Sequence, residues 1–223
     1  MFLLTGEILL KISPAVPSNR ADKLAALLTE ICPQYGIDTA DIFHEFIANV
    51  LHESGSFTTY SESLNYSVEA LKQKFGRHRI TESQAEQFGR KPGKPANQKA
   101  IANILYGGSW GKNNLGNTET NDGWDLRGSG PIQITGRANL IMFANYMRKR
   151  FGVFNTVQQW AELLRTDDRW GIHSACWVFA IAKKLIDEAE NDQAILIRKR
   201  INGGMMGIVD TQEFYERAKL YVV

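Results

Sequence analysis

Glu53 combines a titratable carboxyl group with a position that favours the protonated form of that group. It follows residues 39–52, where apolar residues recur at helical spacing. At about 100° per residue, Glu53 lies within roughly 40° of Ile42 and Phe46 on the apolar stripe. Burial and the negative end of the helix dipole both disfavour a charged carboxylate. We therefore expect Glu53 to act as a general acid, which donates a proton near neutral pH.

A second carboxylate, Glu62, follows nine residues later in a polar stretch without helical periodicity. A turn at Gly55 can bring this stretch back past the end of the helix. Two carboxyl groups in different environments suit glycoside hydrolysis, where one protonates the leaving oxygen and the other activates water. The alternative interpretation is that Glu62 is a solvated loop glutamate, and its spacing from Glu53 does not decide between the two.

The elements that must position these residues are mostly helical. Capping residues and apolar periodicity predict helices over residues 21–31, 39–52, 67–75, 81–89, 97–107, 135–150, 156–165, 171–187 and 192–201, and a last one capped by Asp210 with Glu213. The stretch 171–187 is apolar nearly all round, which predicts a central buried helix. Residues 56–66 predict a small β-hairpin or an extended segment. Residues 107–131, rich in Gly and Asn, predict a long polar loop.

The composition is that of a soluble globular protein. The chain has 223 residues, of which 43% are hydrophobic and 22% charged, enough for one domain with two lobes. We expect residues 1–37 to pack on a catalytic domain that covers residues 38–223. The net charge of +2 is too small to indicate a nucleic-acid partner. Cys32 and Cys176 make no disulfide framework; Cys176 reads as a buried free thiol, and a single bridge stays open.

Four motifs occur in order along the chain: HESGSF at residues 52–57, ESLNYS at 62–67, RGSGPIQITGRANL at 127–140 and INGG at 201–204. Together they resemble glycoside hydrolase family 19, which holds chitinases and many phage endolysins. The resemblance implies a lysozyme-like, bilobal, mainly α-helical fold. It also implies inverting hydrolysis of a β-1,4 bond at an N-acetylated sugar. The short spacing between the two glutamates is similar to the endolysin branch rather than to plant chitinases.

The resemblance also assigns roles to individual residues. The acid of the family falls on Glu53, its base on Glu62, and the hydroxyl that positions the attacking water on Thr135. Its substrate-contacting amides fall on Gln133, Asn139 and Asn202, which can bind sugar hydroxyl and acetamido groups.

For four candidate residues, a purely structural role is an alternative to a role in the site. Thr135 stands where a helix N-cap is expected, and Asn202 stands at a predicted helix end. Tyr106 and Trp124 are of the type that stacks on sugar faces, but either can equally belong to the core.

The region of residues 72–112 is markedly basic, and its stretch from residue 87 onward has no acidic residue. Such a run is often just a solvated face. The functional interpretation is attraction to an anionic cell-surface polymer. Peptidoglycan carries carboxylates and chitin does not, so this region bears on the choice of substrate.

The resulting prediction is an endolysin-type muramidase that cleaves bacterial peptidoglycan and lyses cells. The main alternative is a chitinase acting on a chitin-like glycan. A lytic transglycosylase and a catalytically inactive glycan-binding protein are further ones. We expect a monomer without cofactor or metal, because the spacing of His44 and His52 is not that of a zinc motif. No signal peptide is apparent, so we expect the protein to stay in the producer's cytoplasm and to reach the cell wall after release.

Overall fold

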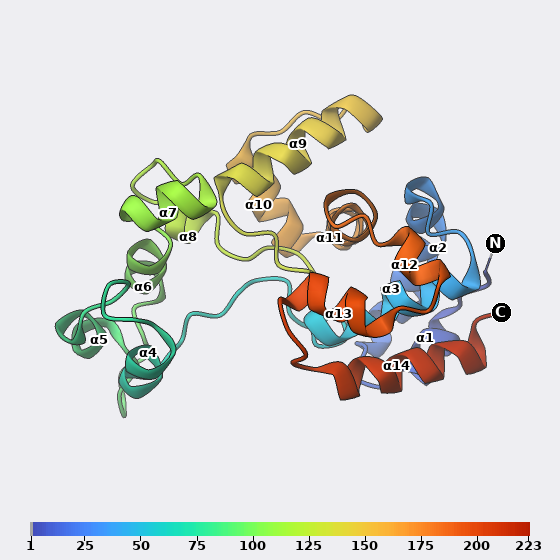
Figure 1. Ribbon diagram of the computed structural model, residues 1–223, viewed down its shortest axis with the longest axis horizontal. Helices are drawn as coiled ribbons and strands as arrows, with labels where there is room; N and C mark the ends of the chain where they lie inside the picture. The colour runs from blue at the N-terminus through green and yellow to red at the C-terminus, as the bar shows by residue number, and fades with distance from the viewer. Residues whose placement is uncertain (1) are drawn as a thin grey trace. The chain divides into compact units, whose positions relative to one another are not determined.

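The computed structural model describes residues 2–223 and consists mainly of α-helices (Figure 1). The predicted mainly α-helical class is therefore confirmed. The chain divides into two compact units: unit 1 contains Met1–Tyr60, Gly130–Gln133 and Leu163–Val223, and unit 2 contains Ser61–Ser129 and Ile134–Glu162. In the part of the chain that the structure describes, no helix is both long and apolar enough to span a membrane.

Unit 1 is built around one buried helix, α3 (Ala40–Glu53), in which every residue from position 42 to 51 is buried. Helices α12, α13 and α14 pack against α3, while α2 contacts both α1 and α11. The bounds of these elements and their short neighbours are α1 (Gly6–Ile12), η1 (Ser18–Arg20), α2 (Ala21–Ile31), η2 (Cys32–Tyr35), α11 (Asp168–Cys176), η3 (Trp177–Ala182), α12 (Ile186–Glu190), α13 (Ala194–Asn202) and α14 (Ile208–Tyr221).

Local hydrogen bonds and a tight turn fix both ends of α3. The side chain of Thr39 caps the first turn by accepting the backbone N–H of Ile42. After Glu53, the Ser54 hydroxyl accepts the backbone N–H of Phe57 at 2.8 Å. Ser56 and Phe57 have φ angles of 61° and 63°, a left-handed backbone that non-glycine residues rarely adopt. This turn ends the helix and leaves Glu53 at its C-terminus.

Unit 2 packs short helices around an apolar cluster. Its helices are α4 (Val68–Lys74), α5 (Glu82–Phe88), α6 (Gln98–Leu105), α7 (Gly108–Leu115), α8 (Asp122–Asp125) and α9 (Arg137–Phe151), while α10 (Val157–Thr166) begins in unit 2 and ends in unit 1. The buried cluster consists of Leu64, Val68, Leu71, Ile80, Ala85, Ile101, Ala102 and Leu105. The predicted caps at Ser67, Asn97 and the Thr81–Gln84 capping box are confirmed.

The prediction of one long loop over residues 107–131 is wrong, because this stretch contains α7 and α8. A close backbone approach accounts for its glycine content. A Cβ atom on Gly111 would lie 1.9 Å from the carbonyl oxygen of Tyr106. Helix α7 then ends at Gly116, which has a φ of 68°. The glycines therefore permit tight packing rather than a loop.

Two other helix predictions need correction. The buried helix predicted over residues 171–187 is broken, because α11 passes into the π-helix η3 and Lys184 then has a φ of 53°. Apolar periodicity does not detect this break, since the side chains on both sides of it are buried or apolar. Asp210 does not cap the last helix, which begins at Ile208 after Gly207.

Two further predictions concern the segment of residues 56–66 and the N-terminal segment. Within the described chain, residues 56–66 form no hairpin: residues 56–58 belong to the turn after α3, and residues 59–66 form an irregular segment with an isolated bridge between Ser61 and Ser129. Residues 2–37 carry α1 and α2 and belong to unit 1, where α1 also contacts α14. The domain boundary after residue 37 stays a prediction.

Cys32 and Cys176 are buried free thiols, with their Sγ atoms 3.8 Å apart. Burial raises the pKa of the Cys32 thiol well above its ordinary value, and the neighbouring thiol adds to this effect. A thiol that keeps its proton is a poor nucleophile, so Cys32 serves packing in unit 1, and Cys176 is buried beside it.

Candidate active site

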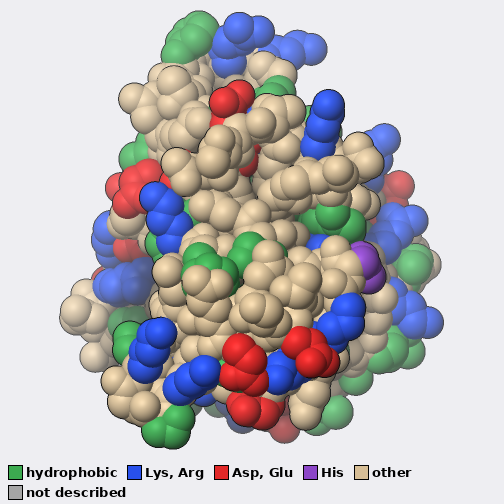
Figure 2. All heavy atoms as spheres, turned by 90° about the vertical axis from the view of Figure 1, so that its left-hand side faces the viewer, with side chains coloured by type: hydrophobic (Ala, Val, Ile, Leu, Met, Phe, Trp, Pro, Cys, Tyr) green, Lys and Arg blue, Asp and Glu red, His purple; other side chains and the backbone are tan. Residues whose placement is uncertain are grey.

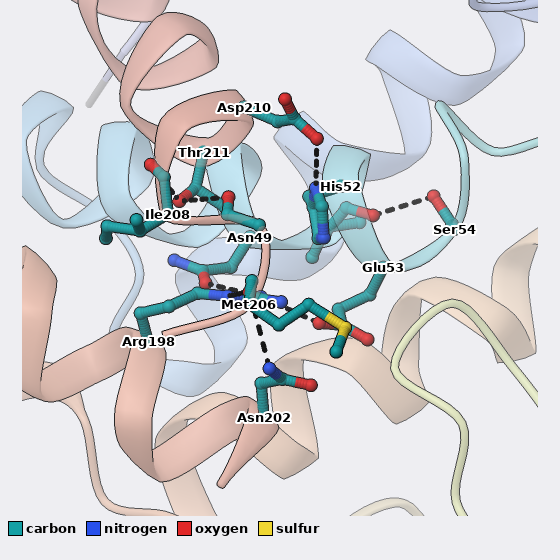
Figure 3. A network of polar contacts seen from close by, with 12 residues as sticks. Asn49, His52, Glu53, Ser54, Arg198, Asn202, Met206, Ile208, Asp210 and Thr211 are labelled. Atoms are coloured by element: carbon teal, nitrogen blue, oxygen red, sulfur yellow. Dashed lines mark hydrogen bonds and ion pairs between the residues drawn. The ribbon is translucent and has the colours of Figure 1, made fainter. Parts of the chain in front are cut away.

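The Glu53 carboxylate lies in a polar cluster of unit 1 that α3 and α13 build (Figure 3). Nη1 of Arg198 lies 2.7 Å from Oε1 of Glu53, and the side chains are 2% and 21% exposed. The same guanidinium donates from Nε to the Met206 carbonyl oxygen at 2.7 Å and from Nη1 to Asn49 Oδ1 at 3.4 Å. We call Asn49, Glu53, Arg198, Asn202 and Met206 the Glu53 cluster.

Asn202 joins this cluster through a backbone carbonyl. It is the last residue of α13, and its amide donates to the Met206 carbonyl oxygen at 3.3 Å. Gly203, with a φ of 78°, is the C-cap of the helix, so the amide of Asn202 is not used up as a cap. The Met206 side chain is 78% exposed and extends in the direction of the Glu53 carboxylate in Figure 3. Arg198 therefore links Glu53 and Asn202 within one network.

His52 contacts the loop of residues 203–207, which joins α13 to α14. Its Nδ1 lies 3.3 Å from Oδ2 of Asp210, in the first turn of α14. A Cβ atom on Gly207 would lie 2.1 Å from His52 Nε2, so only glycine allows the loop to sit on the imidazole ring. Among the described residues, no group of His, Cys, Asp and Glu side chains is arranged to hold a metal ion.

Arg198 is the residue of the Glu53 cluster that the sequence did not point to. In the sequence it stands beside Lys199 and Arg200, as one of three charges on an apparently solvated helix. The one available signal was its position four residues before Asn202, on the same helix face. The Arg198 guanidinium lies 2.7 Å from the Glu53 carboxylate, so it is the positive charge that acts most directly on this group. The expectation from the sequence left out this nearest charge.

Glu62 lies on the extended segment of unit 2, and both of its carboxylate oxygens accept hydrogen bonds. The Tyr106 hydroxyl donates to Oε1 at 2.5 Å, and the Gly128 backbone N–H donates to Oε2 at 3.1 Å. The Glu62 backbone N–H donates in turn to the Gly128 carbonyl oxygen at 3.0 Å. Glu62 is therefore a fixed, half-buried carboxylate rather than a freely solvated one. The side-chain amide of Asn117 donates to the Tyr106 carbonyl oxygen at 2.8 Å. We call Glu62, Tyr106, Asn117 and Gly128 the Glu62 cluster.

The motif before α9 places three of the predicted residues. Gly136, with a φ of 86°, is the N-cap of α9 and no side chain caps the helix, which excludes the capping role for Thr135. The exposed Asn139 amide donates to the Thr135 carbonyl oxygen at 2.8 Å. Gln133 belongs to unit 1, has a φ of 47°, and donates from Nε2 to Gly130 O at 2.8 Å. The structure thus groups Thr135 with Asn139.

Tyr106 and Trp124 are both half-buried and pack against the apolar cluster of unit 2. The guanidinium of Arg127 lies over the Trp124 ring, 3.8 Å from its centroid. Arg127 also donates to the Trp124 carbonyl oxygen at 2.8 Å and to Ser61 Oγ at 3.2 Å. One face of Trp124 is therefore covered, and sugar stacking on its other face or on Tyr106 stays a prediction.

Comparisons with known proteins give one relative in sequence and a shared fold. No family model matches the chain. A Haemophilus influenzae protein described as a glycosyl hydrolase family 19 domain-containing protein is 32% identical over 176 residues, which cover 79% of this chain and 74% of that protein.

Two crystal structures of chitinase C resemble the fold. One is from Streptomyces griseus and the other is of a mutant form, with 14% and 13% identity and a TM-score of 0.54 for each. Each match covers 98% of this chain and 75% of the other. At such identities the similarity concerns the fold alone, and the predicted lysozyme-like helical class is confirmed.

Proposed function

The chain belongs to glycoside hydrolase family 19, and we propose that this glycosidase acts on bacterial peptidoglycan. The proposed bond is the β-1,4 bond between N-acetylmuramic acid and N-acetylglucosamine, whose cleavage lyses cells. The observation that carries the proposal is that Glu53 and Glu62 are each fixed by a polar cluster of their own. Hydrolysis of a glycosidic bond needs two such groups, and both are present, which argues against an inactive glycan-binding protein.

We infer that Glu53 is the proton donor. Its proton moves to the glycosidic oxygen as the bond between that oxygen and C1 breaks, and negative charge develops on the carboxylate. Arg198, at 2.7 Å, is already in place to stabilise this charge. The exposed Asn202 amide lies in the same cluster, and we propose that it binds a sugar hydroxyl or acetamido group.

Glu62 is the proposed base. It takes a proton from a water molecule whose oxygen bonds to C1 on the face opposite the leaving group, so the product has the inverted configuration. Tyr106 and Gly128 each occupy one acceptor site of the carboxylate, which leaves further lone pairs for the water. Thr135 is proposed to hold that water. After turnover Glu62 carries the extra proton and Glu53 lacks one, and exchange with solvent restores both.

The amides Gln133 and Asn139 are the remaining proposed sugar contacts. Asn139 is exposed, and one of its N–H groups is used by the Thr135 carbonyl. Its Oδ1 can accept a sugar hydroxyl. Gln133 is partly exposed on a turn that its own side chain closes.

The exposed charge of unit 2 supports peptidoglycan over chitin. Within residues 72–112, Glu86 neutralises Lys72 and Lys91 at 2.7 and 3.1 Å. Six other basic residues are exposed and form no ion pair with described residues: Lys74, Arg77, Arg90, Lys94, Lys99 and Lys112. Figure 2 shows Lys and Arg side chains spread over one face, with a group of Asp and Glu side chains among them near its lower edge. Only peptidoglycan, among the two glycans, offers carboxylates to such a surface.

Mass spectrometry of muropeptides after digestion of purified peptidoglycan tests the proposal. A muramidase releases fragments with reducing N-acetylmuramic acid ends, and Glu53→Gln releases none. Anhydro ends would instead identify a transglycosylase. No release by the wild-type protein would contradict the proposed substrate.

A chitinase is the second candidate, and the shared fold with chitinase C favours it. N-acetylglucosamine oligomers offered in parallel separate the two. Cleavage of these oligomers without any release from peptidoglycan would establish the chitinase, and the proposed roles of Glu53 and Glu62 would then apply to that substrate.

A further inference from the structure

The shortest contact in the Glu62 cluster is the hydrogen bond from the Tyr106 hydroxyl to Glu62, and the Tyr106 ring takes no part in it. Its Oη donates to Glu62 Oε1 at 2.5 Å, while the ring packs on the apolar cluster of unit 2. On the other oxygen, Gly128 supplies a backbone N–H that no side-chain substitution removes. Among the described residues, the phenol is therefore the one side-chain donor to this carboxylate, and it restricts how the carboxylate can rotate.

The position of Tyr106 is itself fixed at both ends. It is the C-cap of α6, and its backbone N–H donates to the Ala102 carbonyl oxygen at 2.8 Å. Its own carbonyl oxygen accepts the amide of Asn117 at 2.8 Å. Gly111 packs directly on this carbonyl, where a Cβ atom would clash. A hydrogen bond from so restrained a phenol orients its acceptor.

Asn117 extends this restraint to the start of α9. The residue is 4% exposed, and its Oδ1 accepts the backbone N–H of Arg137 at 2.9 Å. Arg137 stands two residues after Thr135 and is paired with Asp122 at 2.6 Å. The chain of contacts therefore runs from the proposed base to the segment of the proposed water-holding hydroxyl, entirely within unit 2.

The chemistry of a phenol suits this task. Burial, with the neighbouring Glu62 charge, raises the pKa of Tyr106 well above its ordinary value, so the hydroxyl donates at every working pH. A neutral donor orients a carboxylate and favours its charged form without cancelling its charge. A cation in the same place would compete with the proton that the base must accept.

We propose that Tyr106 is a positioning residue that aims the Glu62 carboxylate at the attacking water, with Asn117 holding Tyr106 in register with Thr135. The proposal rests on the proposed function of Glu62 as the base. It differs from the prediction that Tyr106 stacks on a sugar, because stacking needs only the ring.

Tyr106→Phe tests this distinction, since it removes the hydroxyl and keeps the ring. The expected result is a roughly 10- to 100-fold lower kcat, the factor that a hydrogen bond to a charged group carries, with a nearly unchanged KM. Tyr66→Phe is the matched control: Glu62 charge acts on Tyr66, but no hydrogen bond joins the two among the described contacts.

Two outcomes would overturn the proposal. One is a kcat within about threefold of wild type, and the other is a change confined to KM, which indicates stacking. Carbon-13 NMR of the Glu62 carboxyl group in the free protein gives a readout that needs no substrate. Its signal should change in Tyr106→Phe and not in Tyr66→Phe. If wild type cleaves neither glycan, the proposed function fails while this NMR comparison still decides whether Tyr106 holds Glu62.

Discussion

The two candidate carboxylates are held by partners of opposite kinds. Glu53 faces the permanent charge of buried Arg198, whereas Glu62 accepts from a neutral phenol, Tyr106, and the backbone amide of Gly128. A cation stabilises a carboxylate once its proton has left, which suits a proton donor in the transition state. Neutral donors fix the direction of a carboxylate and leave its charge available, which suits a base. The difference in partners therefore fits the two proposed tasks of acid and base.

The two clusters also differ in the secondary-structure elements on which their residues lie. The Glu53 cluster joins packed helices α3 and α13 to the loop before α14, so its ion pair belongs to the structure of unit 1. The Glu62 cluster joins an extended segment to the turn at Gly128. We therefore expect substitutions around Glu53 to cost stability as well as activity, and substitutions around Glu62 to cost mainly activity.

The largest expected effect is that of Glu53→Gln. Loss of the proton donor should lower kcat by roughly 10²- to 10⁴-fold, while the amide, which has the same shape as the carboxyl group, keeps an oxygen beside Arg198 and the protein stays folded. An oligosaccharide with a 4-nitrophenol leaving group needs little protonation, so its cleavage should fall much less. Equal losses on both substrates would contradict the role as acid, and full activity would end the mechanism.

Glu62→Ala should lower activity by roughly 10²- to 10³-fold, because no group then takes the proton of the attacking water. Azide is small enough to enter the space that the Glu62 side chain leaves, and it attacks C1 without the help of a base. It should restore cleavage and yield the α-glycosyl azide, which NMR identifies. Glu69→Ala, an exposed glutamate on α4, is the control. If azide neither restores activity nor appears in the product, Glu62 is not the base.

Arg198→Met tests whether the Glu53 cluster contributes more to the stability of the protein than the Glu62 cluster does. Breaking a buried ion pair leaves Glu53 without its cation and should lower the free energy of unfolding by about 3 kcal/mol in urea titrations. The control is Arg200→Met, whose guanidinium is 43% exposed in its pair with Glu188, and which should cost at most about 1 kcal/mol. Tyr106→Phe should also stay near the control. A similar loss in all three variants would remove the contrast between the clusters.

The last comparison concerns the stability of unit 1 alone, through Glu45, a carboxyl on α3 that is 2% exposed. Burial, reinforced by the charge of Asp192 and opposed by Lys219, raises the pKa of Glu45 from 4.5 to about 7. The folded protein therefore holds a proton that the unfolded chain loses above pH 4.5, and its stability falls as pH rises toward 7. The full cost is about 3 kcal/mol above pH 7.

Glu45→Gln should abolish this loss of stability. Relative to wild type, the variant should gain stability between pH 4.5 and 7, measured by urea unfolding at a series of pH values. Glu69→Gln, on the exposed side of α4, should show no such gain. A parallel pH dependence in wild type and Glu45→Gln would show that another group causes it.

Local signals in the sequence were enough for most helices. A cap acts within one turn, so Thr39, Ser67 and Asn97 each identify a helix start without knowledge of the fold. The failures lie where distant contacts decide. Helix α14 starts before Asp210 because Gly207 packs on His52, and α7 forms where composition indicated a loop because Gly111 packs on Tyr106.

The same limit applies to the candidate site. The motifs pointed to Glu53, Glu62 and Thr135, but the partners that give each carboxylate its electrostatic environment are remote in sequence. Neither Arg198 nor Tyr106 stands near its carboxylate along the chain, and neither pairing leaves a periodic trace. Whether the remaining predicted contacts bind sugar stays a prediction.

The most direct test of two separately held carboxylates acting as acid and base is the configuration of the first product. Proton NMR of a soluble, uncrosslinked peptidoglycan strand during digestion resolves the two anomers before they interconvert. The account predicts that the α anomer of the new reducing end appears first, since water attacks opposite the leaving group. An initial β anomer, or an anhydro end without any reducing end, would contradict it.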